Sequence, residues 1–116
     1  LLVEDNPTNM MFTSDYLTMK GYNLVTAENG LMAIEKAYIH YPNLILMDIQ
    51  MPELDGIETI KRLRSSPEFA TVPIIALTAL AMPGDRERCL AAGANEYLAK
   101  PVSLKKLLDR IIYFLT

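Results

Sequence analysis

Four apolar runs in this chain end in polar residues, and this pattern constrains the fold more than any other feature of the sequence. The runs are Leu1–Val3, Leu44–Met47, Ile74–Leu77 and Tyr97–Ala99, and they lead into Glu4 and Asp5, Asp48, Thr78, and Lys100 respectively. If the runs are parallel strands, these polar groups gather at one edge of one sheet. In open α/β sheets, ligands bind outside the carboxyl ends of the strands. Three carboxylates, a hydroxyl and an amine there predict a site for a divalent cation and a phosphoryl group.

Helical spacing of apolar residues alternates with these strand-like runs. Asn6 followed by Pro7 is typical of a helix start, because proline lacks only an N–H that the first turn leaves unpaired. Gly21 and Gly93 are suited to ending helices, and Ser103 to starting the last one. The predicted strands cover residues 1–4, 23–27, 43–47, 71–77 and 95–99.

The predicted helices carry apolar residues at helical spacing. The last helix is expected to place six residues on one stripe: Leu104, Leu107, Leu108, Ile111, Ile112 and Leu115. Its charged residues, Lys105, Lys106, Asp109 and Arg110, are expected to face solvent. In the first helix the apolar residues are Met11, Phe12, Tyr16 and Leu17.

Five strands, each followed by a helix, predict the α/β class with a parallel sheet covered on both sides. The continuous apolar character of the third and fourth strands agrees with burial on both faces. The expected architecture is a doubly wound, flavodoxin-like sheet of order 2-1-3-4-5.

The length of 116 residues fits one domain, expected to span 1–116. A net charge of −3 argues against sequence-blind nucleic-acid binding. No apolar run approaches the roughly 20 residues of a membrane span, so no membrane contact is expected. The N-terminus does not resemble a signal peptide, and Cys89 is alone, which favours the cytoplasm. The short first run and the missing Met start lead us to expect a first strand truncated at its N-terminus.

The three carboxylates carry a specific chemical prediction. Glu4, Asp5 and Asp48 should converge, because the first and third strands are neighbours in the expected order. Carboxylates that close together raise at least one pKa unless a cation neutralises them. Hard oxygen ligands suit Mg²⁺, or Mn²⁺. A carboxylate can take up a phosphoryl group to form an aspartyl phosphate. Lys100 and Thr78 could then contact phosphoryl oxygens.

Each of these residues taken alone also fits an ordinary structural role. Asp48 could be a turn former or a helix cap, Thr78 a cap, and Lys100 a solvated side chain. Unrelated structural roles would not place every group at the same sheet edge, so the joint pattern favours the site.

The sequence resembles the receiver domains of two-component response regulators over essentially its whole length. The matching segments are Leu2–Asn6, Met47–Pro52 with Asp55-Gly56 after it, Leu77–Ala79, Gly93-Ala94 and Lys100-Pro101. By position, the resemblance implies that Asp48 is the phosphoacceptor and that Glu4 and Asp5 hold Mg²⁺, Asp5 directly and Glu4 largely through water. It implies a further metal ligand in the backbone carbonyl of Gln50, and phosphoryl-contacting switch residues in Thr78 and Lys100.

The resemblance also implies a cis Lys100–Pro101 bond and a switch role for Tyr97. The donor would be a histidine kinase or a His-containing phosphotransfer domain, and His40 is expected to be an ordinary surface residue. An output domain or partner protein would bind the segment Leu80–Met82, the helix after it and Tyr97. From the residues alone, Tyr97 could equally be a partly buried strand aromatic, and Leu80 and Met82 could fold back onto the core.

Three other functions compete with this one. A flavodoxin-type redox carrier would need a phosphate-binding first loop, but the loop Glu4–Pro7 is acidic. A phosphatase with an aspartyl-phosphate intermediate commonly has a second Asp two residues after the nucleophile, where this chain has Gln50. A phosphorylation-independent interaction module on the same fold is the remaining alternative. The receiver would phosphorylate and dephosphorylate itself without being a turnover enzyme, and its motifs look most like receivers of hybrid sensor kinases.

Overall fold

Strands and helices alternate along the described chain, which comprises residues 1–51, 54–78 and 83–116 of a computed structural model. In chain order the elements are β1 (Leu2–Val3), α1 (Pro7–Met19), β2 (Thr26–Ala27), α2 (Gly30–His40), β3 (Ile45–Asp48), α3 (Gly56–Arg64), the short 3₁₀ helix η1 (Pro67–Phe69), β4 (Ile74–Thr78), α4 (Asp85–Ala92), β5 (Glu96–Ala99) and α5 (Leu104–Leu115).

The strands form one parallel sheet of order β2-β1-β3-β4-β5. The register pairs Val3 with Met47 and Asp48 with Leu77, so the strand ends lie side by side. The predicted fold class and strand order are therefore confirmed. The order reverses between β1 and β3, which is where ligands bind in doubly wound folds.

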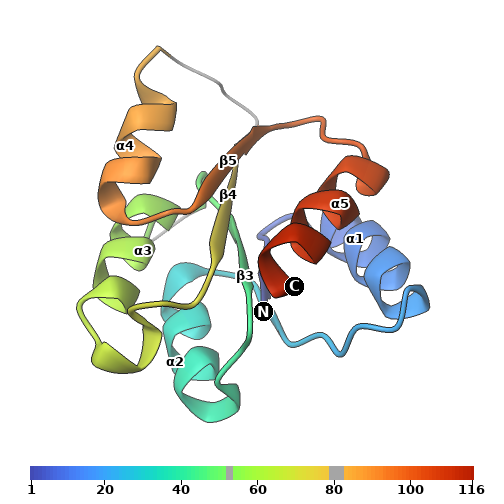
Figure 1. The fold of residues 1–116 in the computed structure, drawn as a ribbon, viewed down its shortest axis with the longest axis horizontal. Helices are drawn as coiled ribbons and strands as arrows, with labels where there is room; N and C mark the ends of the chain where they lie inside the picture. The colour runs from blue at the N-terminus through green and yellow to red at the C-terminus, as the bar shows by residue number, and fades with distance from the viewer. Residues whose placement is uncertain (52–53, 79–82) are drawn as a thin grey trace.

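Helices cover both faces of the sheet, with α2, α3 and α4 on one side and α1 and α5 on the other (Figure 1). Each face has its own apolar core. One core gathers buried residues such as Ile45, Met47 and Phe69, and the other gathers Leu46, Ile75 and Leu107. Because β3 and β4 contribute to both cores, every residue of these two strands is buried, as their continuous apolar sequence predicts.

Helix ends follow the capping residues that the sequence predicts. Asn6 Oδ1 accepts a hydrogen bond from Asn9 N at 3.0 Å, and Pro7 is the first helical residue of α1. Gly21 follows α1 with a φ of 96°, a conformation that glycine adopts without strain. Ser103 Oγ accepts from Lys106 N at 3.0 Å at the start of α5. These local interactions fix where the chain leaves the sheet edge.

The strands are shorter than predicted at their N-terminal ends. The second strand was expected over 23–27, but β2 begins at Thr26, because the neighbouring β1 pairs with it at two positions. The fourth was expected to start at Thr71 and begins at Ile74, since Pro73 has no N–H to donate. The third strand begins two residues later than predicted, and the fifth strand begins one residue later. Asp48 and Thr78 are the last residues of β3 and β4, one residue beyond the predicted ends.

In α1 and α5, more apolar residues follow helical spacing than are buried in the structure. In α5 only Leu107 and Ile111 are buried, whereas Ile112 and Leu115 are 43% and 40% exposed. In α1 only Leu17 is buried, and Met11 and Phe12 are exposed. Helical spacing of apolar residues therefore extends beyond the part of each helix that is buried.

Arg110 departs from the expectation that it only faces solvent. Its Nη2 lies 2.7 Å from Glu96 Oε2 on β5, and its guanidinium lies 4.4 Å from the centroid of the Tyr113 ring. Arg110 therefore ties α5 to β5. Within the described ranges, no helix is both long and apolar enough to cross a membrane.

Candidate functional site

The polar residues that follow the strands meet at the carboxyl edge of the sheet. Glu4 and Asp5 come directly after β1, and Asp48 closes β3. Each contributes a carboxylate oxygen to a cluster whose members all lie within 4.8 Å of one another. The predicted convergence of the three carboxylates is therefore confirmed.

Burial differs sharply among the three acids. Glu4 and Asp48 are 6% and 4% exposed, while Asp5 is exposed. Glu4 and Asp48 thus form the buried part of the cluster, and Asp5 forms its solvent-exposed part. An ion entering from solvent would meet Asp5 and then the buried pair.

Lys100 supplies the positive charge of the site. Its Nζ lies 2.7 Å from Glu4 Oε1 and 3.7 Å from Asp48 Oδ2, so the shorter contact is with Glu4. Its backbone N donates to the Thr78 carbonyl oxygen at 2.6 Å, which joins the ends of β4 and β5. The Lys100–Pro101 bond is cis, as the resemblance implied. Thr78 is buried at the same edge.

The surroundings of the two buried acids shift their pKa values in opposite directions. Burial, and then the neighbouring Glu4 carboxylate, raise the pKa of Asp48 from 3.8 to about 8, although Lys100 opposes the shift. Burial alone would also raise the pKa of Glu4, but hydrogen bonds from Asp48 and Lys100 bring it below its ordinary value. The pair is therefore best described as a protonated Asp48 beside an ionised Glu4. One lysine does not neutralise three carboxylates.

This surplus of negative charge fits a small dication. Ligand oxygens around an octahedral Mg²⁺ lie about 3 to 4 Å apart. The carboxylate oxygens of Glu4, Asp5 and Asp48, all within 4.8 Å, need to close only slightly to share one ion. Mg²⁺ also keeps several waters, so not every carboxylate has to bind directly. The donor set therefore passes the test for Mg²⁺.

The loop after β3 contributes to the same site. Gln50 N donates to Asp48 Oδ1 at 3.2 Å, which orients the carboxylate. Tyr97 lies on β5, half-buried, and packs against the core on the α2, α3 and α4 side. The segment Leu80–Met82, predicted to bind a partner, lies outside the described residues. His40 is exposed at the far end of α2 and so is not part of the site, as predicted.

A pocket of about 500 Å³ opens beside the buried acids. Its lining includes Glu4 and Lys100 together with Phe12 from α1 and Leu104 from α5. The site is thus reachable from the α1 and α5 side of the sheet.

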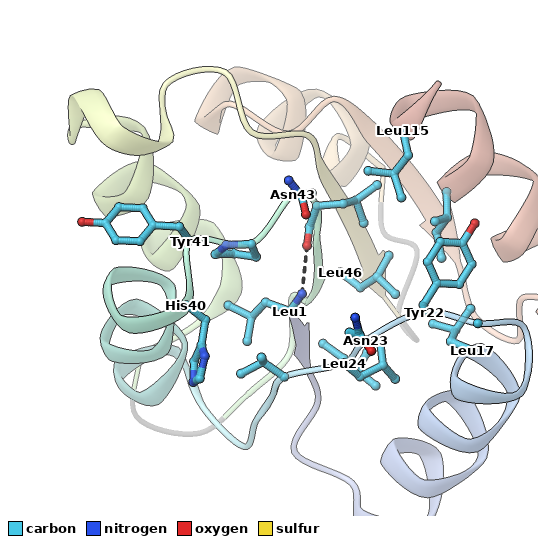
Figure 2. Close-up of a pocket in the computed structure, with 16 residues that line it drawn as sticks. Leu1, Leu17, Tyr22, Asn23, Leu24, His40, Tyr41, Asn43, Leu46 and Leu115 are labelled. Carbon is cyan, nitrogen blue, oxygen red and sulfur yellow. Dashed lines mark hydrogen bonds between the residues drawn. The ribbon is translucent and has the colours of Figure 1, made fainter.

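A second pocket, of about 430 Å³, lies at the opposite edge of the sheet (Figure 2). The described residues that line it, among them Leu24, Leu46 and Tyr22, include no carboxylate and no lysine or arginine. The Leu1 amino group reaches the Leu44 carbonyl oxygen there at 2.9 Å. The described lining of this pocket therefore offers no carboxylate to hold a cation.

Two features of the site were not predicted from the sequence. The Glu4–Lys100 ion pair joins residues 96 positions apart, and no local pattern indicates which acid a lysine will choose. The close approach of Gly30 to the loop after β3 was also missed, although Gly30 directly follows Asn29, which caps α2.

Comparison with known proteins decides the family. The family model for the response regulator receiver domain matches residues 1–112. The chain belongs to the response regulator receiver family. It is accordingly a receiver domain of two-component phosphorelay signalling, and receiver domains interact with histidine kinases and with output or partner proteins.

Among curated relatives, the polar-differentiation response regulator DivK of Brucella anthropi is 42% identical over 115 residues, covering 99% of this receiver and 94% of DivK. Among solved structures, the receiver domain of a sensor histidine kinase from Pseudomonas aeruginosa PAO1 is 40% identical, with a TM-score of 0.91, covering 98% of this chain and 93% of that one. That structure has a magnesium ion coordinated in its active-site cleft.

The receiver domain of a histidine kinase from Syntrophus aciditrophicus is 33% identical, with a TM-score of 0.91, covering 98% of this chain and 86% of that one. Family membership decides against the flavodoxin-type carrier, which the acidic first loop already disfavoured. It also decides against the phosphatase, which Gln50 already disfavoured.

Proposed function

We propose that Asp48 accepts a phosphoryl group from a phosphohistidine of a histidine kinase or a His-containing phosphotransfer domain. The observation that carries the proposal is the buried Asp48 carboxylate, with oxygens of Glu4 and Asp5 within 4.8 Å and Lys100 Nζ at 3.7 Å. In the transfer, a carboxylate oxygen of Asp48 forms the new P–O bond as the P–N bond breaks. The imidazole of the donor leaves and takes up a proton from water.

The metal is proposed to be Mg²⁺, with Mn²⁺ as a substitute. Its ligands would be Glu4, Asp5, Asp48 and the backbone carbonyl of Gln50, with Asp5 binding directly and Glu4 largely through water. When bound, the ion supplies positive charge that keeps Asp48 ionised and offsets the charge of the incoming phosphoryl group. Because Glu4 and Asp48 are buried, water screens their charge little, which favours uptake of a cation.

Lys100 and Thr78 are proposed to contact the phosphoryl oxygens. Lys100 Nζ lies closer to Glu4 than to Asp48, by 2.7 Å against 3.7 Å, so it has to move only a short way to reach a group on Asp48. Since the Lys100 N–H is bonded to the Thr78 carbonyl, the two residues are linked through their backbones. Phosphoryl transfer depends mainly on such positioning and charge stabilisation.

The output is proposed to be a population shift. Phosphorylation adds charge that Thr78 and Lys100 contact in one arrangement of their loops. Thr78 immediately precedes the segment 79–82, so its movement would reach Leu80–Met82 and then α4. Tyr97 on β5 would move with it. This surface would bind an output domain or partner protein, and the domain, taken as residues 1–116, would work in the cytoplasm.

The receiver could be part of a hybrid sensor kinase, which is our preference, or a regulator resembling DivK. Two similar solved structures are receivers of histidine kinases, at 40% and 33% identity. The DivK relatives, at 41% to 42% identity, support the other possibility equally well. The reading frame on either side of these residues would decide between them.

Incubation with Mg²⁺ and acetyl phosphate, followed by intact-mass measurement, tests the proposed function. The wild-type chain is expected to gain the mass of one phosphoryl group, and to lose this gain when EDTA is added first. Asp48→Asn should gain none. An unchanged gain in Asp48→Asn would move the acceptor elsewhere, and no gain in the wild type would favour a phosphorylation-independent module.

A further inference from the structure

Gly30, the first residue of α2, approaches the loop after β3 more closely than any side chain would allow. A Cβ atom added at Gly30 would lie 2.2 Å from Thr59 Oγ1 and 2.8 Å from the Leu54 carbonyl oxygen. Both distances are far inside normal van der Waals contact. The φ of Gly30 is not positive, so the position requires glycine for space and not for backbone conformation. The loop and the start of α2 are therefore in direct backbone contact.

The other end of the same loop is fixed against Asp48 itself. Gly56 N donates to the Ile49 carbonyl oxygen at 3.0 Å. A Cβ at Gly56 would lie 2.5 Å from the Asp48 carbonyl oxygen and 2.6 Å from Ile49 Cα. The start of α3 thus packs on the backbone of the last residue of β3. Gln50, next to Ile49 in the chain, donates its N–H to the Asp48 carboxylate.

Thr59 links the two contacts. Its side chain is fully buried, and its Oγ1 donates to the Asp55 carbonyl oxygen at 2.8 Å. Asp55 in turn caps α3 by accepting from Glu58 N at 2.8 Å. A group that pushed on Thr59 from the side of Gly30 would therefore move the residue that starts α3. Displacement at α2 has a short, packed route to the loop.

We propose that Gly30 is a positioning residue for the metal site, acting through Leu54 and Thr59 on the start of α3, which packs on the backbone of Asp48 and Ile49 next to Gln50. Gly30 touches neither the carboxylates nor the phosphoryl position. Its role is to let α2 support the loop backbone, so that the Gln50 carbonyl and the Asp48 carboxylate keep a fixed relative position. The link to metal affinity rests on the proposed function, whereas the support of the loop does not.

Two variants separate this role from ordinary packing. Gly30→Ala introduces both close contacts. Gly30→Ala with Thr59→Ala removes the contact at Thr59 Oγ1 and keeps the one at the Leu54 carbonyl. We expect the double variant to regain part of the lost urea stability. Both variants should bind Mg²⁺ about 10-fold more weakly than wild type by calorimetry, in line with the usual effect of residues that support metal ligands.

Gly21→Ala is the matched control. Gly21 has a φ of 96°, and no atom lies within 4 Å of an added Cβ, so alanine there is strained without touching the loop. Its stability loss should be about 1 kcal/mol. Its Mg²⁺ dissociation constant should match that of the wild type within about 2-fold, because Gly21 follows α1 at the far edge of the sheet from the acids.

A second readout needs no metal. Exchange of the Gly56 amide, measured in EDTA, should be at least about 10-fold faster in Gly30→Ala than in Gly21→Ala at equal global stability. If the wild type binds no Mg²⁺, the proposed function fails and this exchange rate alone decides the inference. Equal Gly56 exchange, or equal Mg²⁺ affinity, in Gly30→Ala and in Gly21→Ala would overturn it.

Discussion

At the scale of single residues, the charge interactions among Asp48, Glu4 and Lys100 set the properties of the site. Lys100 is nearer to Glu4 than to Asp48, and Asp48 carries the raised pKa of about 8. A buried acid in that state is poised to exchange its proton for a cation. Mg²⁺ would favour the ionised form of Asp48, which burial and the Glu4 carboxylate disfavour.

Replacing Asp48 by Asn should stabilise the metal-free protein increasingly as pH rises. Because the folded pKa of about 8 exceeds the ordinary 3.8, the folded state binds the proton more tightly. Stability from this group is full below about pH 4 and is lost as pH rises towards 8. The pKa of Glu4 is lowered from its ordinary value of 4.5, so protonation of Glu4 changes the stability only below about pH 4.5. That lies outside the pH range in which Asp48 acts.

Urea unfolding in EDTA at pH 5 and pH 8.5 measures this effect. Asp48→Asn should exceed wild type by about 1 to 3 kcal/mol at pH 8.5, and by clearly less at pH 5. Asp15→Asn, the same change at an exposed position of α1, serves as the control. A gain at Asp48→Asn that does not change with pH would contradict the assignment of the raised pKa.

Replacing Lys100 by Gln should separate metal binding from phosphoryl transfer. Removing the ammonium leaves the acids more negative, so the Mg²⁺ dissociation constant should fall or stay the same. The rate of phosphorylation by acetyl phosphate should drop by about 100-fold, because a charge that stabilises the transferring group is lost. Lys105→Gln on α5 should change neither quantity. Weaker Mg²⁺ binding in Lys100→Gln would argue that Lys100 instead maintains the shape of the site.

At the scale of the elements, Arg64 at the end of α3 adds polar contacts between three segments that also share one apolar core. Its guanidinium donates to the carbonyl oxygens of Gly93, at 2.9 Å, and of Phe69, and to Asn95 Oδ1 at 2.8 Å. Asn95 Oδ1 also accepts from Ile74 N at 2.9 Å, at the start of β4. Arg64 therefore holds α3, η1 and the turn before β5 in one arrangement.

Arg64→Met should destabilise the protein by about 2 to 4 kcal/mol, because it leaves buried carbonyl groups without their donor. Arg62→Met is the control. The Arg62 side chain, two residues before Arg64 on the same helix, is 52% exposed and forms an ion pair only with Glu58 in the described structure. Its loss should therefore reduce the free energy of unfolding by under about 0.5 kcal/mol. Urea unfolding at neutral pH measures both. Equal losses would mean that the Arg64 hydrogen bonds contribute little.

At the scale of the whole molecule, the sequence predicted the strand order and the convergence of the acids because both depend on repeated local signals. Each strand is an apolar run, and each run ends in a chemically distinct residue. The strand starts were mispredicted because pairing with neighbours sets them, as in β2. Sequence periodicity does not show how much of a helix the sheet covers, and Met11 and Ile112 are exposed although both follow helical spacing.

Contacts between distant residues explain the remaining gaps. The pairing of Lys100 with Glu4, the Arg64 hydrogen bonds and the approach of Gly30 to Leu54 all join elements far apart in the chain. No pattern within one element indicates them. The sequence of this chain does not indicate the partner either, because binding also depends on the surface of the other protein.

Borohydride reduction of the phosphorylated protein, followed by peptide mapping, tests the central claim most directly. Reduction converts an aspartyl phosphate into homoserine, which marks the acceptor residue. After treatment with Mg²⁺ and acetyl phosphate, we expect homoserine at position 48 and none at position 5. A mark at Asp5, or a phosphoryl group on His40 that resists borohydride, would contradict the account.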